Sequence, residues 1–336
     1  MANEIEKLNA ITLANIAKFN AKTDANIEKI NGLEFTGVTL FKGIFGFGTN
    51  SSDATVGVTN LVSNVGVVAT DTSAVGTART AGAAAEYGTG TAIFGFGQTD
   101  TSGDSKTGIT NLVNTSGVVA SDVSAVGTAR QDLAAAGYGS DKAIFGFGKT
   151  GDWPNEDPSG VTNLVNNSGV VQSDTSAVGT ARLQLQAETY DDDKAIFFYG
   201  YAEWPSLLDT KNLVNNSGVV ASDASTTGSS RRWAGTAGYG TGTAIVAFGA
   251  ISTGNFDKSN LINTSGVISS DITGVGTTRN GVAGCQYGED KGIMGFGRNG
   301  SFYSTSNLVS NAGVVATDTT GVGTARSQLM AASYGT

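Results

Sequence analysis

The sequence lacks histidine altogether and contains a single cysteine, Cys285, among its 336 residues. Without histidine, no histidine-dependent metal site and no Ser-His-Asp triad can form. With one cysteine, no disulfide bond can form within the chain. Cys285 stands where related segments carry small residues such as Ala85 and Ala237, so we expect a buried structural side chain rather than a nucleophile. These absences predict a protein that is not an enzyme and needs no cofactor or metal.

Basic runs and long apolar runs are absent as well. The chain carries 29 Asp and Glu against 20 Lys and Arg, which gives a net charge of -9 and a pI near 4.5. This acidity argues against nucleic acid as a partner. No segment approaches the roughly 20 apolar residues of a membrane span, so we expect no membrane insertion. The N-terminus, MANEIEKLNA, has early acidic residues and no apolar core, so we expect no signal peptide and synthesis in the cytoplasm.

Proline is scarce, with 3 residues, whereas glycine is abundant, with 48, and the glycines recur at fixed places. From residue 42 onward a block of about 50 residues occurs six times, and each copy keeps the spacing of its landmarks. In one copy, Asp122 follows Asn111 by 11 residues, Arg130 follows Asp122 by 8, and Tyr138 follows Arg130 by 8. Six strand-rich repeats of this length predict a β-propeller of six blades.

One repeat illustrates the blade that we expect. Residues 128–139 are rich in Ala and Gly, which suits an innermost strand close to the axis of a propeller. Residues 143–148 (AIFGFG) alternate bulky residues with glycine, as expected for a second strand packed on both faces. Residues 162–165 and 170–174 are the expected third strand and outer strand, joined by a hairpin turn. We therefore predict six blades of four strands each.

The first repeat begins in the middle of a blade. Residues 42–48 match a second strand, and residues 326–334 match a first strand. Pairing these two segments would close the ring of blades and leave no free sheet edge. We therefore expect a propeller over residues 37–336 that is closed by its C-terminal strand, preceded by an arm over residues 1–36.

The order of the motifs TARxxLAAAGYG, KAIFGFG, NLV and GVVASD resembles that of kelch repeats, over residues 42–336. The resemblance implies an all-β fold, a six-bladed kelch-like propeller. Kelch-like oxidases hold copper with His and Tyr side chains. Because this sequence has no histidine, that chemistry is not expected here.

Charged residues that recur in every repeat are expected to be structural. Each Asp would hold the Arg eight residues later, as Asp174 would hold Arg182, in a clasp at the crossover between blades. The alternative is that the six Arg side chains form an anion-binding mouth. Asp191, Asp192 and Asp193 suggest a cation site, but they occupy a turn, so we favour a solvated turn.

Function is expected where the repeats differ, and they differ most between the second and third strands of each blade, in segments that we name the b–c loops. These loops concentrate the aromatic residues that lie outside repeat positions, and all of them project from one face of a propeller. The fourth repeat departs furthest from the others and is our first choice for a site. The candidate binding residues are Trp153, Tyr201, Trp204, Trp233, Phe256, Phe302 and Tyr303. If exposed, these rings would stack on sugars or anchor a protein partner; the alternative is that they pack within the loops.

Residues 1–36 contain a repeat of their own, Ile-x-Lys-apolar-Asn-small, which recurs every 11 residues. In a helix its apolar residues would form one stripe, as in a nearly straight coiled coil, whereas the alternative is three short turns. The residues of this stripe, the expected anchor, are Ile5, Leu8, Ile16, Phe19, Ile27 and Ile30. The arm is too thin to bury them by itself, so we expect it to dock on a partner.

An arm of such units followed by a body rich in Gly, Ser and Thr resembles virion proteins of tailed bacteriophages, such as tail or fibre proteins. The resemblance implies a non-catalytic structural protein located in the virion. Residues 1–36 would anchor the chain to other virion proteins, and the b–c loops would contact a host glycan or surface receptor. The alternative is a free, carbohydrate-binding, lectin-like propeller.

Overall fold

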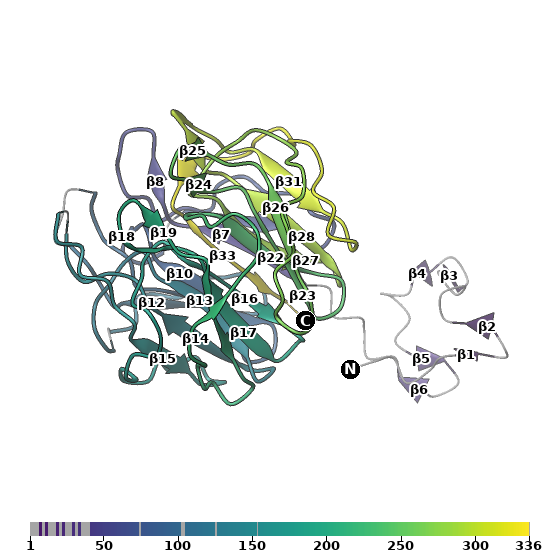
Figure 1. Cartoon of the computed structure of the whole chain (residues 1–336). Helices are drawn as coiled ribbons and strands as arrows, with labels where there is room; N and C mark the ends of the chain where they lie inside the picture. The colour runs from purple at the N-terminus through teal and green to yellow at the C-terminus, as the bar shows by residue number, and fades with distance from the viewer. Residues whose placement is uncertain are drawn as a thin grey trace.

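The computed structural model describes residues 41–335 except 74, 102–104, 125 and 153, together with six two-residue strands between residues 7 and 34 (Figure 1). In these residues the chain is all-β, without helices, and its strands pair antiparallel. The all-β prediction is therefore confirmed. Four of the predicted site residues, Ile5, Ile16, Ile27 and Trp153, lie outside the described residues.

Six antiparallel sheets of three or four strands make up the body. In each sheet the first strand pairs with the second, and the second pairs with the third. The first strands are β10 (Ala83–Tyr87), β13 (Ala134–Tyr138), β16 (Gln186–Tyr190), β22 (Gly235–Tyr239), β27 (Ala283–Tyr287) and β33 (Met330–Tyr334). The second strands are β11 (Thr91–Gly95), β14 (Lys142–Gly146), β17 (Lys194–Phe198), β23 (Thr243–Ala247), β28 (Lys291–Gly295) and β7 (Lys42–Gly46). The third strands are β12 (Thr110–Val113), β15 (Thr162–Val165), β20 (Thr210–Val214), β26 (Ser259–Ile262), β31 (Ser306–Val309) and β9 (Thr59–Val62).

The two ends of the body meet in one sheet. Strand β33 pairs with β7, with Met330 opposite Gly46 and Tyr334 opposite Lys42, so the predicted pairing of the last strand with residues 42–48 is confirmed (Figure 1). The first strands also contact one another in a cycle, in the order β10, β13, β16, β22, β27, β33 and back to β10. We refer to the line around which these six strands are arranged as the axis.

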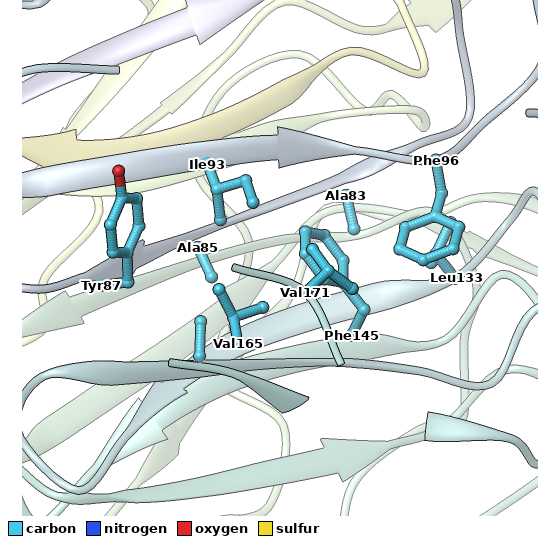
Figure 2. Packing of buried hydrophobic residues seen from close by; sticks show 10 residues of the cluster. Ala83, Ala85, Tyr87, Ile93, Phe96, Leu133, Phe145, Val165 and Val171 are labelled. Atoms are coloured by element: carbon cyan, nitrogen blue, oxygen red, sulfur yellow. The ribbon is translucent and has the colours of Figure 1, made fainter. Parts of the chain in front are cut away.

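Neighbouring sheets pack face to face with small residues against large ones. Figure 2 shows Ala83 and Ala85 of β10 in the same cluster as Phe96 and as Phe145, which comes from the next sheet. The rings of Phe96 and Phe145 lie 5.1 Å apart between centroids. A Cβ atom added at Gly95 would come within 2.8 Å of Cζ of Phe145. Four of the second strands, β7, β11, β14 and β28, end in a glycine of this kind, and a phenylalanine ring of the neighbouring sheet occupies the space that a side chain would need.

The second strands are shorter than predicted. The expected strand 143–148 ends at Gly146, because Phe147 and Gly148 both take left-handed conformations, with φ of 64° and 97°. Gly148 donates its N–H at 2.9 Å to the carbonyl of Arg182 in the next repeat instead of continuing the ladder. The expected first strand 128–139 also begins late, at residue 134, because Asp132 is left-handed, with φ of 56°.

The predicted outer strands are irregular, and within the described residues only the fourth repeat has a fourth strand, β21 (Ala224–Ser225). In the second repeat the outer segment forms single bridges, Val119 with Val113 and Val123 with Thr110. Between these bridges the outer segment advances by four residues and the third strand by three, which makes a β-bulge. The side chain of Asn111 fills the resulting bulge by donating to the carbonyl of Ala120 at 3.0 Å. The prediction of six regular four-stranded sheets is therefore wrong at the outer edge, because a bulge replaces the ladder there.

Short hairpins occur in three b–c loops. The hairpins pair β18 (Tyr201–Glu203) with β19 (Ser206–Leu207), β24 (Ala250–Ile251) with β25 (Gly254–Asn255), and β29 (Arg298–Asn299) with β30 (Ser301–Phe302). Near the two ends of the body, β8 (Thr49–Asn50) pairs with β32 (Arg326–Ser327), which is distant in the sequence and so forms no hairpin.

The described part of the arm consists of three small hairpins (Figure 1). They are β1 (Lys7–Leu8) with β2 (Ile11–Thr12), β3 (Lys18–Phe19) with β4 (Lys22–Thr23), and β5 (Lys29–Ile30) with β6 (Leu33–Glu34). Leu8, Phe19 and Ile30 thus lie in strands, and the helical stripe is wrong for these positions. The alternative of three short turns is the better description. Two residues separate the strands of each pair in the sequence, Asn-Ala twice and Asn-Gly once, and such pairs favour tight hairpin turns.

Candidate functional site

The repeated arginines are fully buried, and four of them, Arg130, Arg231, Arg279 and Arg326, donate a hydrogen bond to the repeated Asn of their own sheet. The six arginines are Arg79, Arg130, Arg182, Arg231, Arg279 and Arg326. Arg130 donates from Nε to the carbonyl of Phe147 at 2.8 Å, from Nη1 to the carbonyl of Thr128 at 3.0 Å and from Nη2 to Oδ1 of Asn163 at 2.6 Å. Its guanidinium also lies 4.5 Å from the ring centroid of Phe96 in the preceding sheet. Burial lowers the pKa of Arg130 to about 10, so it stays charged at neutral pH. Because all six guanidinium groups are buried, they do not form an exposed anion-binding mouth.

The repeated aspartates lie beside a different arginine from the one that the sequence suggested. Asp174 accepts hydrogen bonds from N and Oγ1 of Thr128, at 3.1 and 2.6 Å, and from Nδ2 of Asn163 at 2.8 Å. Although burial acts to raise it, these hydrogen bonds and the charge of Arg130 lower the pKa of Asp174. Arg182 instead interacts electrostatically with Asp223. The predicted pairing of Asp174 with Arg182 is wrong, because Asp174 ends the sheet that Arg130 begins, whereas Arg182 begins the next one.

A closed cycle of backbone hydrogen bonds surrounds the axis just before the first strands. Its members are the left-handed residues Ala81, Asp132, Gln184, Trp233, Gly281 and Gln328. Each donates its N–H to the carbonyl of its counterpart in the preceding repeat, at distances of 2.8 to 3.2 Å, and Ala81 donates to Gln328 and so completes the cycle. The same six residues line a cavity of about 100 Å³, which we name the loop-side cavity. The varied side chains of this ring therefore meet at one place.

The fourth repeat places an arginine between two tryptophans next to the loop-side cavity. The guanidinium carbon of Arg232 lies 4.1 Å from the ring centroid of Trp204 and 4.3 Å from that of Trp233. Arg232 donates from Nη1 to Oε1 of Gln184 at 2.9 Å, and Trp233 donates from Nε1 to Oδ1 of Asp132 at 3.3 Å. Burial lowers the pKa of Arg232. A flat cation held between two rings of this kind presents a rigid, partly apolar platform.

A network of buried polar and charged side chains contacts the residues that hold this platform. Lys149 lies 2.9 Å from Oε1 of Glu156 and 3.7 Å from Oδ2 of Asp132. Burial favours the neutral amine, but the charges of Asp132 and Glu156 outweigh it and raise the pKa of Lys149. Tyr201 donates from its hydroxyl to Oε2 of Glu156 at 2.9 Å, and burial together with this acceptor raises the pKa of Tyr201. The network fixes the positions of Asp132 and Tyr201, which in turn position Trp233 and Arg232.

The predicted aromatic residues divide into two groups. Tyr201 and Phe256 are buried, as expected if loop residues pack within the loops. Trp204 is 37% exposed, while Trp233, Phe302 and Tyr303 are half-buried. The structure brings Tyr201, Trp204 and Trp233 together around Arg232, whereas Phe256 lies over Arg231 at 4.8 Å and Phe302 lies 6.0 Å from Arg298. Arg232, which joins the three rings, was noticeable in the sequence only as a departure from the repeat.

A second, larger cavity lies at the other end of the axis. It is lined by the ends of the first strands and by the turns that follow them, has a volume of about 560 Å³, and is named here the turn-side cavity. Two of its lining residues, Glu86 and Glu188, were not predicted from the sequence as site residues. The available signal was weak but real, since Glu188 replaces an alanine that most sister repeats keep.

The structure does not favour a cation site at residues 191–193. The turn at residues 191–193 is occupied by ion pairs, since Lys194 lies 2.5 Å from Oδ2 of Asp191 and 3.5 Å from Oδ1 of Asp193. Among the residues that the structure describes, no three His, Cys, Asp or Glu side chains gather closely enough to hold a metal ion. The same residues include no helix that is long and apolar enough to cross a membrane.

Comparison of the sequence with models of known protein families gave no match, and comparison with curated protein sequences gave none either. The function is therefore inferred from the geometry of the axis, its two cavities and the arm.

Proposed function

We propose that residues 37–336 form a six-bladed, kelch-like β-propeller and that the chain is a non-catalytic virion protein of a tailed bacteriophage. Residues 1–36 anchor it to other virion proteins, and the b–c loops face the host. The observation that carries the proposal is that the arm and the b–c loops belong to opposite ends of the axis.

The arm joins the body at the turn side. Phe41 lines the turn-side cavity, and its carbonyl accepts a hydrogen bond of 2.7 Å from Gly288, in a turn at that end. Every first strand runs from the loop-side cavity toward the turn-side cavity, and every second strand runs back. The b–c loops, which follow the second strands, therefore emerge at the end away from Phe41. A chain held by its arm presents these loops outward.

Two features support the propeller. The six sheets are related by the sequence repeat, and their first strands contact one another in a cycle that β33 completes beside β7. The six backbone hydrogen bonds between left-handed residues follow the same cycle. A closed arrangement of this kind needs no partner to cover sheet edges. The body is therefore suited to display, and attachment is left to the arm.

The arm hairpins support an anchoring role. Each has strands of only two residues, and an isolated two-stranded hairpin is at best marginally stable in water. Three such units with regularly spaced apolar residues gain most by packing on another protein. Each apolar side chain buried there contributes about 1.5 to 3 kcal/mol before ordering costs.

A test compares purified phage particles that carry the full chain with particles made in the presence of a chain lacking residues 1–36. The full chain should be found in particles by mass spectrometry, and the shortened chain should fold but stay in the supernatant. The control is Trp204→Ala, which should enter particles normally and reduce their attachment to host cells. Incorporation of the shortened chain at the normal level would contradict the proposal.

A second candidate function is that of a free carbohydrate-binding lectin. It is favoured by the exposure of Trp204 beside Arg232, since a flat exposed ring is a stacking surface for sugars. A free lectin would be retained on glycan resin through Trp204 and would be absent from purified particles. Particle content therefore separates the two functions.

A further inference from the structure

The turn-side cavity has the dimensions of a ligand site. Its volume of about 560 Å³ lies within the range of about 300 to 1,000 Å³ that is typical of pockets for small organic molecules. Its walls come from the first strands of all six sheets and carry mostly small side chains, such as Ala84 and Ala135. The cavity is therefore much wider than a single bound ion needs.

The charge in this cavity has one sign. The titratable side chains that line it are Glu86, Glu188, Asp192, Tyr239, Cys285 and Glu289. No Lys or Arg is among the described residues that line it. Lys142, Lys194 and Lys291, which begin neighbouring second strands, are paired with Asp141, Asp191 and Asp290 at 2.7, 2.5 and 2.8 Å. Lys42, which begins β7, is exposed and does not line the cavity. The carboxylates inside the cavity thus have no cation of their own among these residues.

Glu86 and Glu188 are half-buried, and their surroundings disfavour the ionised form of both carboxyl groups. Burial, together with the charge of Glu86, raises the pKa of Glu188 to about 7, although hydrogen bonds from Thr189 and Thr236 act against the increase. Burial also raises the pKa of Glu86, against hydrogen bonds from Ser333. Two carboxylates that are desolvated and repel each other are stabilised by any cation that comes between them.

The fold itself needs neither carboxylate. The residues equivalent to Glu188 in the other five repeats are Ala85, Ala136, Ala237, Cys285 and Ala332. Those equivalent to Glu86 are Gly137, Thr189, Gly238, Gln286 and Ser333. Each position is therefore filled five times without an acid, and four of the six first strands carry no acid at either position. The two substitutions that introduce charge both line the one cavity, which packing does not explain.

The surrounding groups fit an ammonium ion better than a metal ion. Calcium takes six to eight oxygen ligands, and among the described residues no group of three acidic, His or Cys side chains is placed to hold a metal. An ammonium group donates three hydrogen bonds, which the oxygens of two carboxylates can accept. Alanine-rich walls suit an aliphatic chain.

We propose that the turn-side cavity binds a small aliphatic amine, whose ammonium group pairs with Glu86 and Glu188 and whose chain lies against the alanine-lined wall. The site is independent of the proposed virion function. It lies at the end of the axis where the arm joins the body, so the ammonium group comes either from a free amine or from a lysine side chain.

Isothermal titration calorimetry of the full-length protein at pH 8 tests the site. The probes are putrescine for a free amine and Nα-acetyl-lysinamide for a lysine side chain, with 1,4-butanediol as the uncharged control. One amine should bind and the diol should not, and the tighter amine identifies the source of the ammonium group. Binding should weaken about tenfold at pH 5.5, because Glu188, with a pKa of about 7, is then protonated.

The variants come from the chain itself. Glu188→Ala and Glu86→Ser install residues that sister repeats carry at the same positions, and each should weaken amine binding at least tenfold. The matched control is Asp53→Asn, an exposed carboxylate outside the cavity lining, which should bind as the unchanged protein does. If Glu188→Ala fails to fold, Glu86→Ser and the pH dependence decide. Absence of binding by both amines, or equal binding by the Glu variants, would overturn the proposal.

Discussion

Replacing Glu188 by Ala should change the stability of the protein in a way that depends on pH. The pKa of Glu188 is raised in the folded protein from 4.5 to about 7, chiefly by burial. A carboxyl whose pKa is raised on folding contributes stability that is complete below its unfolded pKa and is lost as the pH rises through its folded pKa. The cost of keeping Glu188 in the cavity is therefore small at pH 4 and complete at pH 8.

The magnitude follows from the two pKa values. Each pKa unit corresponds to about 1.4 kcal/mol, so ionising Glu188 in the folded protein costs about 3 kcal/mol. Alanine fills this position in four sister repeats, so the variant should pack well and carry no such cost. We therefore compare the free energy of unfolding of Glu188→Ala with that of the unchanged protein at each pH. This difference should favour the variant by about 3 kcal/mol more at pH 8 than at pH 4.

Urea unfolding followed by circular dichroism at pH 4, 6 and 8 measures the difference. The aspartates near the buried arginines also respond to pH, but both proteins contain them, so their contribution cancels in the comparison. Asp53→Asn serves as the control and should change the free energy of unfolding by less than about 0.5 kcal/mol at each pH. A difference between Glu188→Ala and the unchanged protein that is the same at pH 4 and pH 8 would refute the argument.

Three further changes test the fold. Asp174→Ala should cost about 1 kcal/mol in a thermal or urea melt, because Asp174 is exposed and Arg130 keeps its bonds to Asn163 and Phe147. A loss above about 3 kcal/mol would mean that the attraction between the charges of Asp174 and Arg130 dominates instead. Gly146→Ala should cost about 1 to 3 kcal/mol, because the new Cβ would lie 2.8 Å from Cζ of Phe197, and an unchanged melting temperature would contradict this packing. Deleting residues 326–336 removes the strand that pairs with β7 and should abolish cooperative unfolding in calorimetry, whereas a normal transition would show that this strand is dispensable.

Much of the body could be predicted from the repeat. The constant register of Asn, Asp, Arg and Tyr identifies equivalent strands, and the pairing of β33 with β7 follows because the chain starts and ends within one repeat. The partner of Asp174 could not be predicted from spacing alone. Arg130 and Arg182 occupy equivalent positions in consecutive repeats, and only the path of the chain shows which of them shares a sheet with Asp174.

The early end of the second strand could not be predicted from the sequence, for a physical reason. The second strand ends early at Gly146 because the next residue, Phe147, takes a left-handed conformation that a bulky residue rarely adopts, and no sequence pattern signals it. The candidate site was only partly predictable. Trp204 and Trp233 stood out as aromatic departures from the repeat, but Glu86 and Glu188 are single changes whose importance appears only when six strands enclose one cavity.

Chemical cross-linking of intact phage particles, read out by mass spectrometry, tests the anchoring proposal most directly. The arm carries Lys7, Lys18, Lys22 and Lys29, and the exposed Lys258 lies in a b–c loop as an internal control. If the arm anchors the chain and the loops face outward, arm lysines should cross-link to other virion proteins and Lys258 should not. Cross-links from Lys258 to virion proteins, with none from the arm, would contradict the proposal.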